Sequence, residues 1–295
     1  MRKRQSLVSV VMPVYNAGQF LAESIESILN QTYKNFEFLI IDDASNDNSR
    51  EIIKRYQKKH SNIILLQNKR RLGISETVKK VISKTKGEFI ARMDADDVAV
   101  SDRLEKQVKY LSRHHETVAV GGQCLIIDKD SRITGKKIFP TDFSDIYRYI
   151  FRFIPVQQPT LMIAAQRLPK NFEYYRDGMN TAEEVELIFK LFKYGKVENL
   201  PDVVLCYRIH QHNSSLINIR QTFFLTLVAR LRAIFQYGYK PDWQGLVITF
   251  IQAVAVLLMP TKLTLFLYKI FRKLNFVRYH NSSLSQLTFN SSVQL

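Results

Sequence analysis

The chain contains few cysteines, and their number and spacing exclude two classes of small stabilised protein. Cys124 and Cys206 are the two cysteines in 295 residues. They are too few and too far apart for a disulfide framework or a zinc site, so we interpret them as two reduced thiols in a cytosolic compartment. With ten glycines and eight prolines, the chain is also neither collagen-like nor of low complexity.

Acidic residues are in deficit. The chain has 43 Lys and Arg against 27 Asp and Glu, a net charge of +16. An excess of this size favours a polyanionic partner, which could be nucleic acid, an anionic membrane face or a phosphorylated substrate. Half of the excess lies in Ile219–His280, which holds nine Lys or Arg and one acid, Asp242.

A long apolar run is missing from the N-terminus. The run Leu7–Met12 is six residues long and stops at Pro13. A secretory leader needs a longer apolar region, so we expect no signal peptide, and we interpret this run as a buried strand. Hydrophobic residues make up 46% of the chain, which is enough for one sizeable core or two modest ones.

Short apolar runs alternate with helical patterns over the first 127 residues. Strands are expected at 7–12, 36–41, 62–66, 89–93 and 118–127. Helices are expected between them: at 20–29, from Ser49 as a capping residue, at 75–84, and from Ser101 or Asp102. This alternation predicts an α/β fold with a mostly parallel sheet. Further along, we expect a turn at 128–132, a helix over Thr181–Tyr194 stopped by Gly195, and a strand over 203–209.

Two acidic loops fall at carboxyl ends of predicted strands, where such sheets bind ligands. Asp94 and Asp96 follow one strand and could share a divalent cation, or divide between a cation and a ribose hydroxyl. They could equally form a solvated turn or an acidic helix start. Asp43, after another strand, could accept a hydrogen bond from a uracil N–H, or the loop could be an Asx-type turn.

Two later positions also suit catalysis or metal binding. Glu183 and Glu184 begin a predicted helix, where a carboxylate with a raised pKa can act as a general base. The alternative is simple stabilisation by the positive end of the helix dipole. His210 follows a predicted strand and could ligate a metal or only make a hydrogen bond.

Taken in order, these motifs resemble the glycosyltransferases of family 2, which have the GT-A fold. The motifs are Val8–Asn16, Ser27–Tyr33, Ile41–Ser49, Lys86–Asp97 with Asp102–Gln107, Gln158–Thr160, Thr181–Glu184 and Tyr207–His210. The resemblance covers residues 6–216. It implies a Rossmann-like, mostly parallel sheet flanked by helices, and an inverting enzyme that uses a nucleotide-sugar donor.

The resemblance also implies a role for each matching residue. Pro13, Tyr15 and Asn16 would line the nucleotide pocket, and Asp43 would contact the base, usually uracil. Asp94 would lie by the ribose.

On the catalytic side, Asp96 would hold the divalent metal, Mn²⁺ or Mg²⁺, with His210 completing its site. Glu184 would be the catalytic base.

Three positions depart from the family pattern. Glu184 stands where Asp is usual, Lys79 where Asn is common, and Gln158 where His is frequent. Glu184 is one methylene longer than the usual base, and the other two changes suggest a different acceptor.

The C-terminal part differs in character. Trp243–Thr261 is nineteen residues without a charge and is followed by basic residues. It could lie in a membrane interface, span the membrane or pack as a buried helix, and apolar surface interleaved with Lys and Arg favours the first. We therefore expect a catalytic domain at 1–218, a basic, apolar, membrane-associating helical region at 219–280 and a flexible tail at 281–295.

The sequence thus predicts a cytoplasmic, metal-dependent glycosyltransferase, peripheral or monotopic at the inner face of the cell membrane. It would transfer a sugar, from a UDP-sugar donor, to a glycan or lipid-linked saccharide in cell-surface polysaccharide biosynthesis. The alternative is a non-catalytic nucleotide-sugar-binding or scaffold subunit. Nucleic-acid binding is disfavoured, because the charge interleaves with apolar residues rather than with stacking aromatics.

Overall fold

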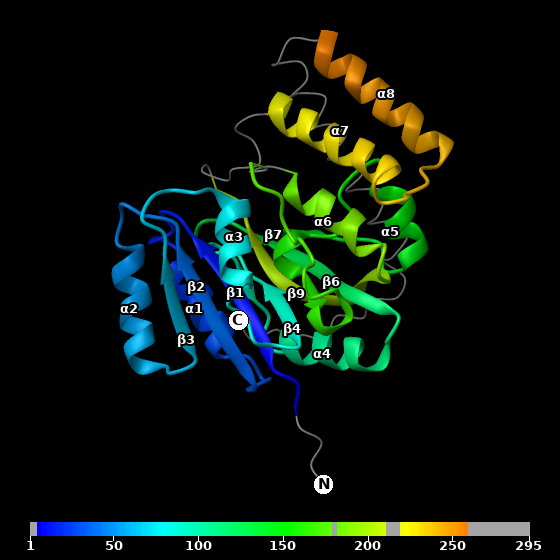
Figure 1. Cartoon of the computed structure of the whole chain (residues 1–295). Coiled ribbons are helices and arrows are strands. Elements are labelled where there is room, and N and C mark those ends of the chain that lie inside the picture. Colours follow the sequence, from blue (N-terminus) through cyan, green and yellow to red (C-terminus); the bar gives the residue numbers. More distant parts are fainter. Residues whose placement is uncertain (1–4, 179–181, 211–218, 259–295) are drawn as a thin grey trace.

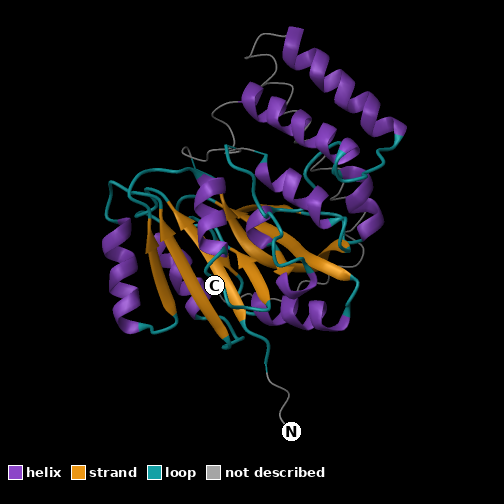
Figure 2. Cartoon of the chain, in the orientation of Figure 1, coloured by secondary structure: helices purple, strands orange, loops and turns teal. Residues whose placement is uncertain are grey.

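A computed structural model describes the chain except for residues 1–4, 179–181, 211–218 and 259–295. Its centre is a nine-stranded mixed sheet in the order β3-β2-β1-β4-β8-β6-β9-β5, with β7 paired to β6. Helices lie on both sides of this sheet (Figure 2). This confirms the predicted α/β class and the GT-A-like arrangement of a mostly parallel sheet flanked by helices.

The bounds of the elements agree with most of the expected segments. The strands are β1 (Val8–Val14), β2 (Phe36–Asp42), β3 (Ile63–Gln67), β4 (Phe89–Arg92), β5 (Val98–Ala99), β6 (Thr117–Ile127), β7 (Ile133–Lys137), β8 (Met162–Ala164) and β9 (Lys196–Arg208). The helices are α1 (Leu21–Leu29), α2 (Ser49–Lys59), α3 (Ile74–Ile82), α4 (Arg103–Arg113), α5 (Phe143–Tyr149), α6 (Glu183–Leu191), α7 (Ile219–Phe235) and α8 (Trp243–Leu258), with short 3₁₀ turns at Gln158–Thr160 and Ala165–Arg167.

The first half of the sheet is parallel and buried on both faces. β3, β2, β1 and β4 pair in parallel, as their separation by helices requires. Val10 and Met12 of β1 pack in the main core, whereas Val11 between them packs on the opposite face, below α3. Because both faces of these strands are buried, their sequences are continuously apolar and do not alternate between apolar and polar residues.

The first strand does not end at Pro13, contrary to the sequence prediction. Val11 O accepts a hydrogen bond from Met93, so odd-numbered residues of β1 turn their backbone groups toward β4. β4 ends at Arg92, so the missing N–H of Pro13 removes no ladder bond on that side.

Two expected helix boundaries are also wrong. Ser49 is the first residue of α2 rather than its cap, and its hydroxyl instead accepts a hydrogen bond from the Ala17 N–H at 3.0 Å. α6 ends at Leu191, short of Gly195. A side chain at Gly195 would lie 2.5 Å from the Glu116 carbonyl, so close strand packing, and not a helix stop, explains this glycine.

The basic C-terminal region forms two helices that pack on the rest of the chain. Ala229 and Ala233 of α7 are buried in one cluster with Leu187 and Phe189 of α6. In Figure 1, α7 lies between α6 and the outermost helix α8. Residues 259–280 and the expected tail lie outside the described residues, and the division at residue 218 stays a prediction.

In the part of the chain that is described, no helix is both long and apolar enough to cross a membrane.

Gln107 of α4 holds the centre of the fold through polar contacts that are fully buried. Its amide donates to Val120 O and Thr160 O and accepts from Arg103 Nε. We expect Gln107→Leu to lower the free energy of unfolding by about 3 kcal/mol, because the buried polar groups that bond Gln107 would lose their hydrogen-bond partner. Urea unfolding measures this; the exposed helical variant Gln57→Leu should change stability by less than about 0.5 kcal/mol.

Candidate active site

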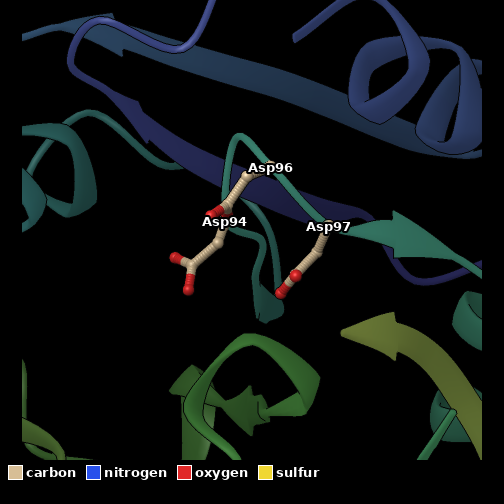
Figure 3. A group of neighbouring side chains, drawn as sticks. All are labelled: Asp94, Asp96 and Asp97. Carbon is tan, nitrogen blue, oxygen red and sulfur yellow. The ribbon is translucent and has the colours of Figure 1, made fainter. Parts of the chain in front are cut away.

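Three aspartates gather in the loop after β4. Three carboxylate oxygens, one from each of Asp94, Asp96 and Asp97, lie within 4.8 Å of one another. Figure 3 shows the three side chains extending from this one tight loop. The loop follows the carboxyl end of β4, a central strand that runs parallel to β1, as the sequence predicted. Three oxygen donors at this spacing suit a hard divalent cation.

Buried guanidinium groups fix the shape of this loop. Arg92 pairs with Asp94 Oδ1 at 2.8 Å, and Arg103 donates to the Arg92 carbonyl at 2.8 Å. Arg208, at the end of β9, donates from its backbone N–H to Asp97 Oδ1 and from Nε to Asp96 O, both at 2.8 Å.

The far end of Arg208 reaches α1, where its Nη2 pairs with Glu23 at 2.6 Å. All three arginines lie within the motifs named above, but no role was predicted for any of them. A charged residue at the end of an apolar run, as Arg92 is after Phe89–Ala91 and Arg208 is after Val203–Tyr207, is the signal that could have identified two of them.

Burial, together with the neighbouring negative charges, raises the pKa of two of these aspartates. Burial raises the pKa of Asp97 well above its usual value, and Asp96 and Asp94 raise it further. Burial likewise raises the pKa of Asp94, although Arg92 partly opposes this. Within the described structure, the buried Asp97 Oδ2 has no hydrogen-bond partner. An oxygen-rich, electron-rich loop with an orphaned buried oxygen fits a divalent cation.

His210 lies beside this loop. Its Nε2 is 2.9 Å from Asp96 Oδ2, and its ring contacts Phe20 at a centroid distance of 5.1 Å. The structure thus brings together the two residues that the resemblance implies as metal ligands. The same contact is a hydrogen bond, so ligation of a metal by His210 stays a prediction.

The predicted nucleotide loops are tied to each other. Asn16 adopts a left-handed backbone conformation, with φ of 49°. Its Oδ1 accepts from the Asn46 N–H at 2.8 Å, and its own N–H donates to Ser45 Oγ at 3.0 Å. These bonds join the segment after β1, which includes Tyr15 and follows Pro13 near the end of that strand, to the segment after β2. The predicted Asx-type turn is present at Asp42, whose Oδ1 accepts a hydrogen bond from the Ser45 N–H.

Asp43 is buried and organises the next loop. Its carboxylate accepts hydrogen bonds from Asn68 Nδ2 and from the N–H groups of Leu72 and Gly73, at 2.7 to 2.9 Å. A carboxylate accepts about four hydrogen bonds, so one position is left for a ligand. The loop that Asp43 holds carries Arg71, whose guanidinium lies 4.0 Å from the centroid of the Tyr15 ring.

The two glutamates begin α6, preceded by Ala182 in a left-handed conformation. Burial raises the pKa of Glu183 well above its usual value, and Glu184 adds to this. Burial also raises the pKa of Glu184, Asp94 raises it further, and a side-chain hydrogen bond with Glu183 and the charge of Arg92 lower it. Burial therefore outweighs the helix dipole, which by itself would lower both pKa values. Thr181 of the predicted motif lies outside the described residues.

The other two departures from the family pattern make contacts with the segment before α6. Lys79 of α3 pairs with Asp177 at 2.8 Å, and Gln158 Nε2 donates to Tyr175 Oη at 3.2 Å. Both substitutions therefore contact the segment that leads to Glu183 and Glu184.

Sequence comparison places the chain in a family. Residues 9–169 match the profile described as "Glycosyl transferase family 2". An uncharacterised glycosyltransferase of Methanocaldococcus jannaschii is 34% identical over 243 residues, which are 81% of this chain and 80% of that protein. The chain belongs to glycosyl transferase family 2, as its motifs indicated, and is a glycosyltransferase.

A third similarity is partial. An Escherichia coli protein named UDP-Glc:alpha-D-GlcNAc-diphosphoundecaprenol beta-1,3-glucosyltransferase WfgD is 35% identical over 134 residues, 45% of this chain and 51% of that protein.

Solved structures share the fold at low sequence identity. Staphylococcus aureus TarS 1–349 in complex with UDP-GlcNAc has a TM-score of 0.60 at 20% identity, covering 84% of this chain and 72% of that one. The mannosyltransferase PcManGT of Pyrobaculum calidifontis, in complex with GDP-Man and Mn²⁺, has a TM-score of 0.58 at 16% identity, covering 95% and 83%. They confirm the expected GT-A-type architecture.

The aspartate loop predicts metal-dependent nucleotide binding. We expect UDP to bind at least tenfold more tightly with Mn²⁺ than with EDTA, and Asp96→Ala to remove this difference, because the variant loses a cation ligand. Isothermal titration calorimetry measures both. Asp102→Ala, which removes a partly exposed carboxylate that pairs with Lys106, should keep the metal effect; equal binding of UDP by the wild type with and without metal would contradict the prediction.

Proposed function

We propose that this protein is an inverting, metal-dependent glycosyltransferase that transfers a sugar from a UDP-sugar to a hydroxyl of a glycan or lipid-linked saccharide. The observation that carries the proposal is the meeting of two acidic groups from distant elements. The aspartate loop after β4 contains Asp94, whose charge raises the pKa of the partly buried Glu184 at the start of α6.

The aspartate loop suits the leaving-group side of the reaction. A divalent cation held by Asp96, with Asp94 and His210 beside it, would neutralise the charge that develops on a departing nucleoside diphosphate. Arg92 pairs with the Asp94 carboxylate and Arg208 bonds the backbone carbonyl of Asp96, so the loop is held in one shape before a cation binds.

Glu184 suits the acceptor side. The acceptor hydroxyl must lose a proton as it attacks the anomeric carbon, and a carboxylate whose pKa is raised toward neutrality takes a proton well. Burial supplies this shift for Glu184, which supports its role as base despite the extra methylene. Attack from the face opposite the leaving group inverts the anomeric carbon, so an α-linked donor would give a β-linked product.

The donor pocket would be formed by Pro13, Tyr15, Asn16 and Asp43. The exposed Tyr15 ring offers an aromatic face and is stacked with Arg71, which directly precedes Leu72, whose N–H donates to Asp43. These groups suit a planar base with an N–H donor, as uracil has. The UDP-GlcNAc complex of TarS and the UDP-Glc in the name of WfgD support UDP as the nucleotide.

The acceptor and the location follow the same reasoning. WfgD is named for an acceptor linked to diphosphoundecaprenol, which supports a lipid-linked saccharide as the acceptor here. Together with the basic residues of 219–280, this supports a reaction at the inner face of the cell membrane, in cell-surface polysaccharide biosynthesis, as part of the proposal.

The proposed base can be tested by removing its charge. We expect Glu184→Gln to lower kcat about 100-fold or more while UDP binding stays unchanged, because the amide cannot take the proton. Release of UDP from UDP-sugars measures kcat, and Glu51→Gln on the exposed side of α2 is the control. Full activity of Glu184→Gln would exclude it as the base, and no turnover by the wild type with any donor would favour the non-catalytic alternative.

The pair of glutamates predicts the pH profile. The base must be ionised, so kcat should fall on the acid side at a pH above the ordinary carboxyl pKa of about 4.3. The hydrogen bond from Glu183 lowers the pKa of Glu184, so Glu183→Leu should move this limb to higher pH. Glu183→Gln keeps a donor and should leave the limb near its wild-type position; an identical shift in both variants would contradict the account.

A further inference from the structure

Helix α8 is oriented with its polar side inward. Thr249 Oγ1 and Gln252 Oε1 accept hydrogen bonds from the buried Arg230 of α7, at 3.1 and 2.8 Å. Gly245 is buried against the Phe151 side chain. These contacts are spread along the helix and fix its rotation about its axis.

The outward side of α8 is apolar except for the exposed Gln244 in its first turn. Its exposed apolar side chains recur at helical spacing and are Trp243, Leu246, Val247, Phe250, Ile251, Val254, Leu257 and Leu258. Trp243 is 71% exposed, Phe250 70% and Leu257 79%. The helix contains no charged residue. We call these eight side chains the α8 face; a contiguous apolar surface of this kind marks an interaction site.

Positive charge borders this face. Arg148 and Lys240 are exposed and line a cavity of about 340 Å³ next to the first turn of α8. The nearby acid, Asp242, is paired with Arg152. The sequence that follows α8 adds five Lys or Arg and no acid up to residue 280. A protein partner with a matching apolar groove would not need this basic border, whereas an anionic bilayer surface does.

We propose that the α8 face inserts into the interfacial region of an anionic lipid bilayer, with α8 lying in the membrane plane. One side of the helix is bound to the protein along its length, so the helix is not surrounded by lipid. Trp243, at the start of the face, suits the boundary between headgroups and acyl chains. This proposal extends the membrane location in the proposed function by naming the surface responsible.

The orientation has a consequence for the acceptor. α8 packs on α7, and Arg232 and Tyr237 bond Glu186 of α6, at 3.1 and 2.6 Å. The membrane-facing helix is therefore joined through α7 to the helix that carries Glu184, as the stacking in Figure 1 shows. A saccharide held by a membrane lipid would approach the acceptor side of the site and not the nucleotide side.

Trp243 makes the test specific, because it is the single tryptophan of the chain. The full-length protein is mixed with vesicles of phosphatidylglycerol or of phosphatidylcholine. We expect a blue shift of the emission with phosphatidylglycerol and quenching by lipids brominated on the acyl chains. Phe250→Asp should weaken vesicle partitioning about tenfold or more. The matched control is Ile133→Asp, which places the same charge at a residue that is 53% exposed on β7, and it should partition like the wild type.

If protein rather than lipid covers the α8 face, the fluorescence of Trp243 will behave differently. A blue shift that depends on protein concentration without vesicles would mean that a second copy covers the face, and would overturn the proposal. Protection of Trp243 from acrylamide at all concentrations without vesicles would mean that the chain covers it, and would overturn it too. UDP binding with Mn²⁺ is measured on the same samples: vesicle binding without nucleotide binding would contradict the proposed function alone, and the reverse would contradict this inference alone.

Discussion

The arrangement of the site depends on buried guanidinium groups that hold an acidic loop in place. Three aspartates within four residues repel one another and lose solvation where they are buried. Arg92, Arg103 and Arg208 compensate by bonding both the carboxylates and the backbone of the loop. Arg208 also reaches Glu23, so the loop after β4, the end of β9 and helix α1 are joined by one side chain. Arginine suits this role because its planar group bonds several acceptors at once.

The compensation is incomplete. Arg92 pairs with Asp94, whereas burial keeps the pKa of Asp97 well above its usual value, and Asp97 Oδ2 has no hydrogen-bond partner in the described structure. A bound cation would supply the positive charge that this loop lacks. Burial also raises the pKa of Glu184, whose carboxyl group makes a side-chain hydrogen bond with Glu183. In the proposed function, the aspartate loop would hold the metal and Glu184 would take the proton of the acceptor hydroxyl.

Local patterns predicted the parts of this protein that depend on local sequence. The strands at 36–41, 62–66 and 89–93 and the acidic loops at their ends were correct, because apolar runs and strand ends are visible in the sequence. The errors were tertiary in origin. Pro13 stays in β1 because β4 ends early, and Ser49 bonds Ala17 rather than its own helix. The inward polar side of α8 depends on Arg230, which only the folded chain places there.

The central claim is that a metal-bound leaving group and a carboxylate base act from opposite faces of the sugar. The stereochemistry of transfer tests this most directly. Proton NMR follows the anomeric signal while the protein turns over α-linked UDP-sugars with Mn²⁺, with water as the acceptor if no saccharide is used. The account predicts that the β-anomer forms first and that the α-anomer appears later by mutarotation. Formation of the α-anomer first would contradict it.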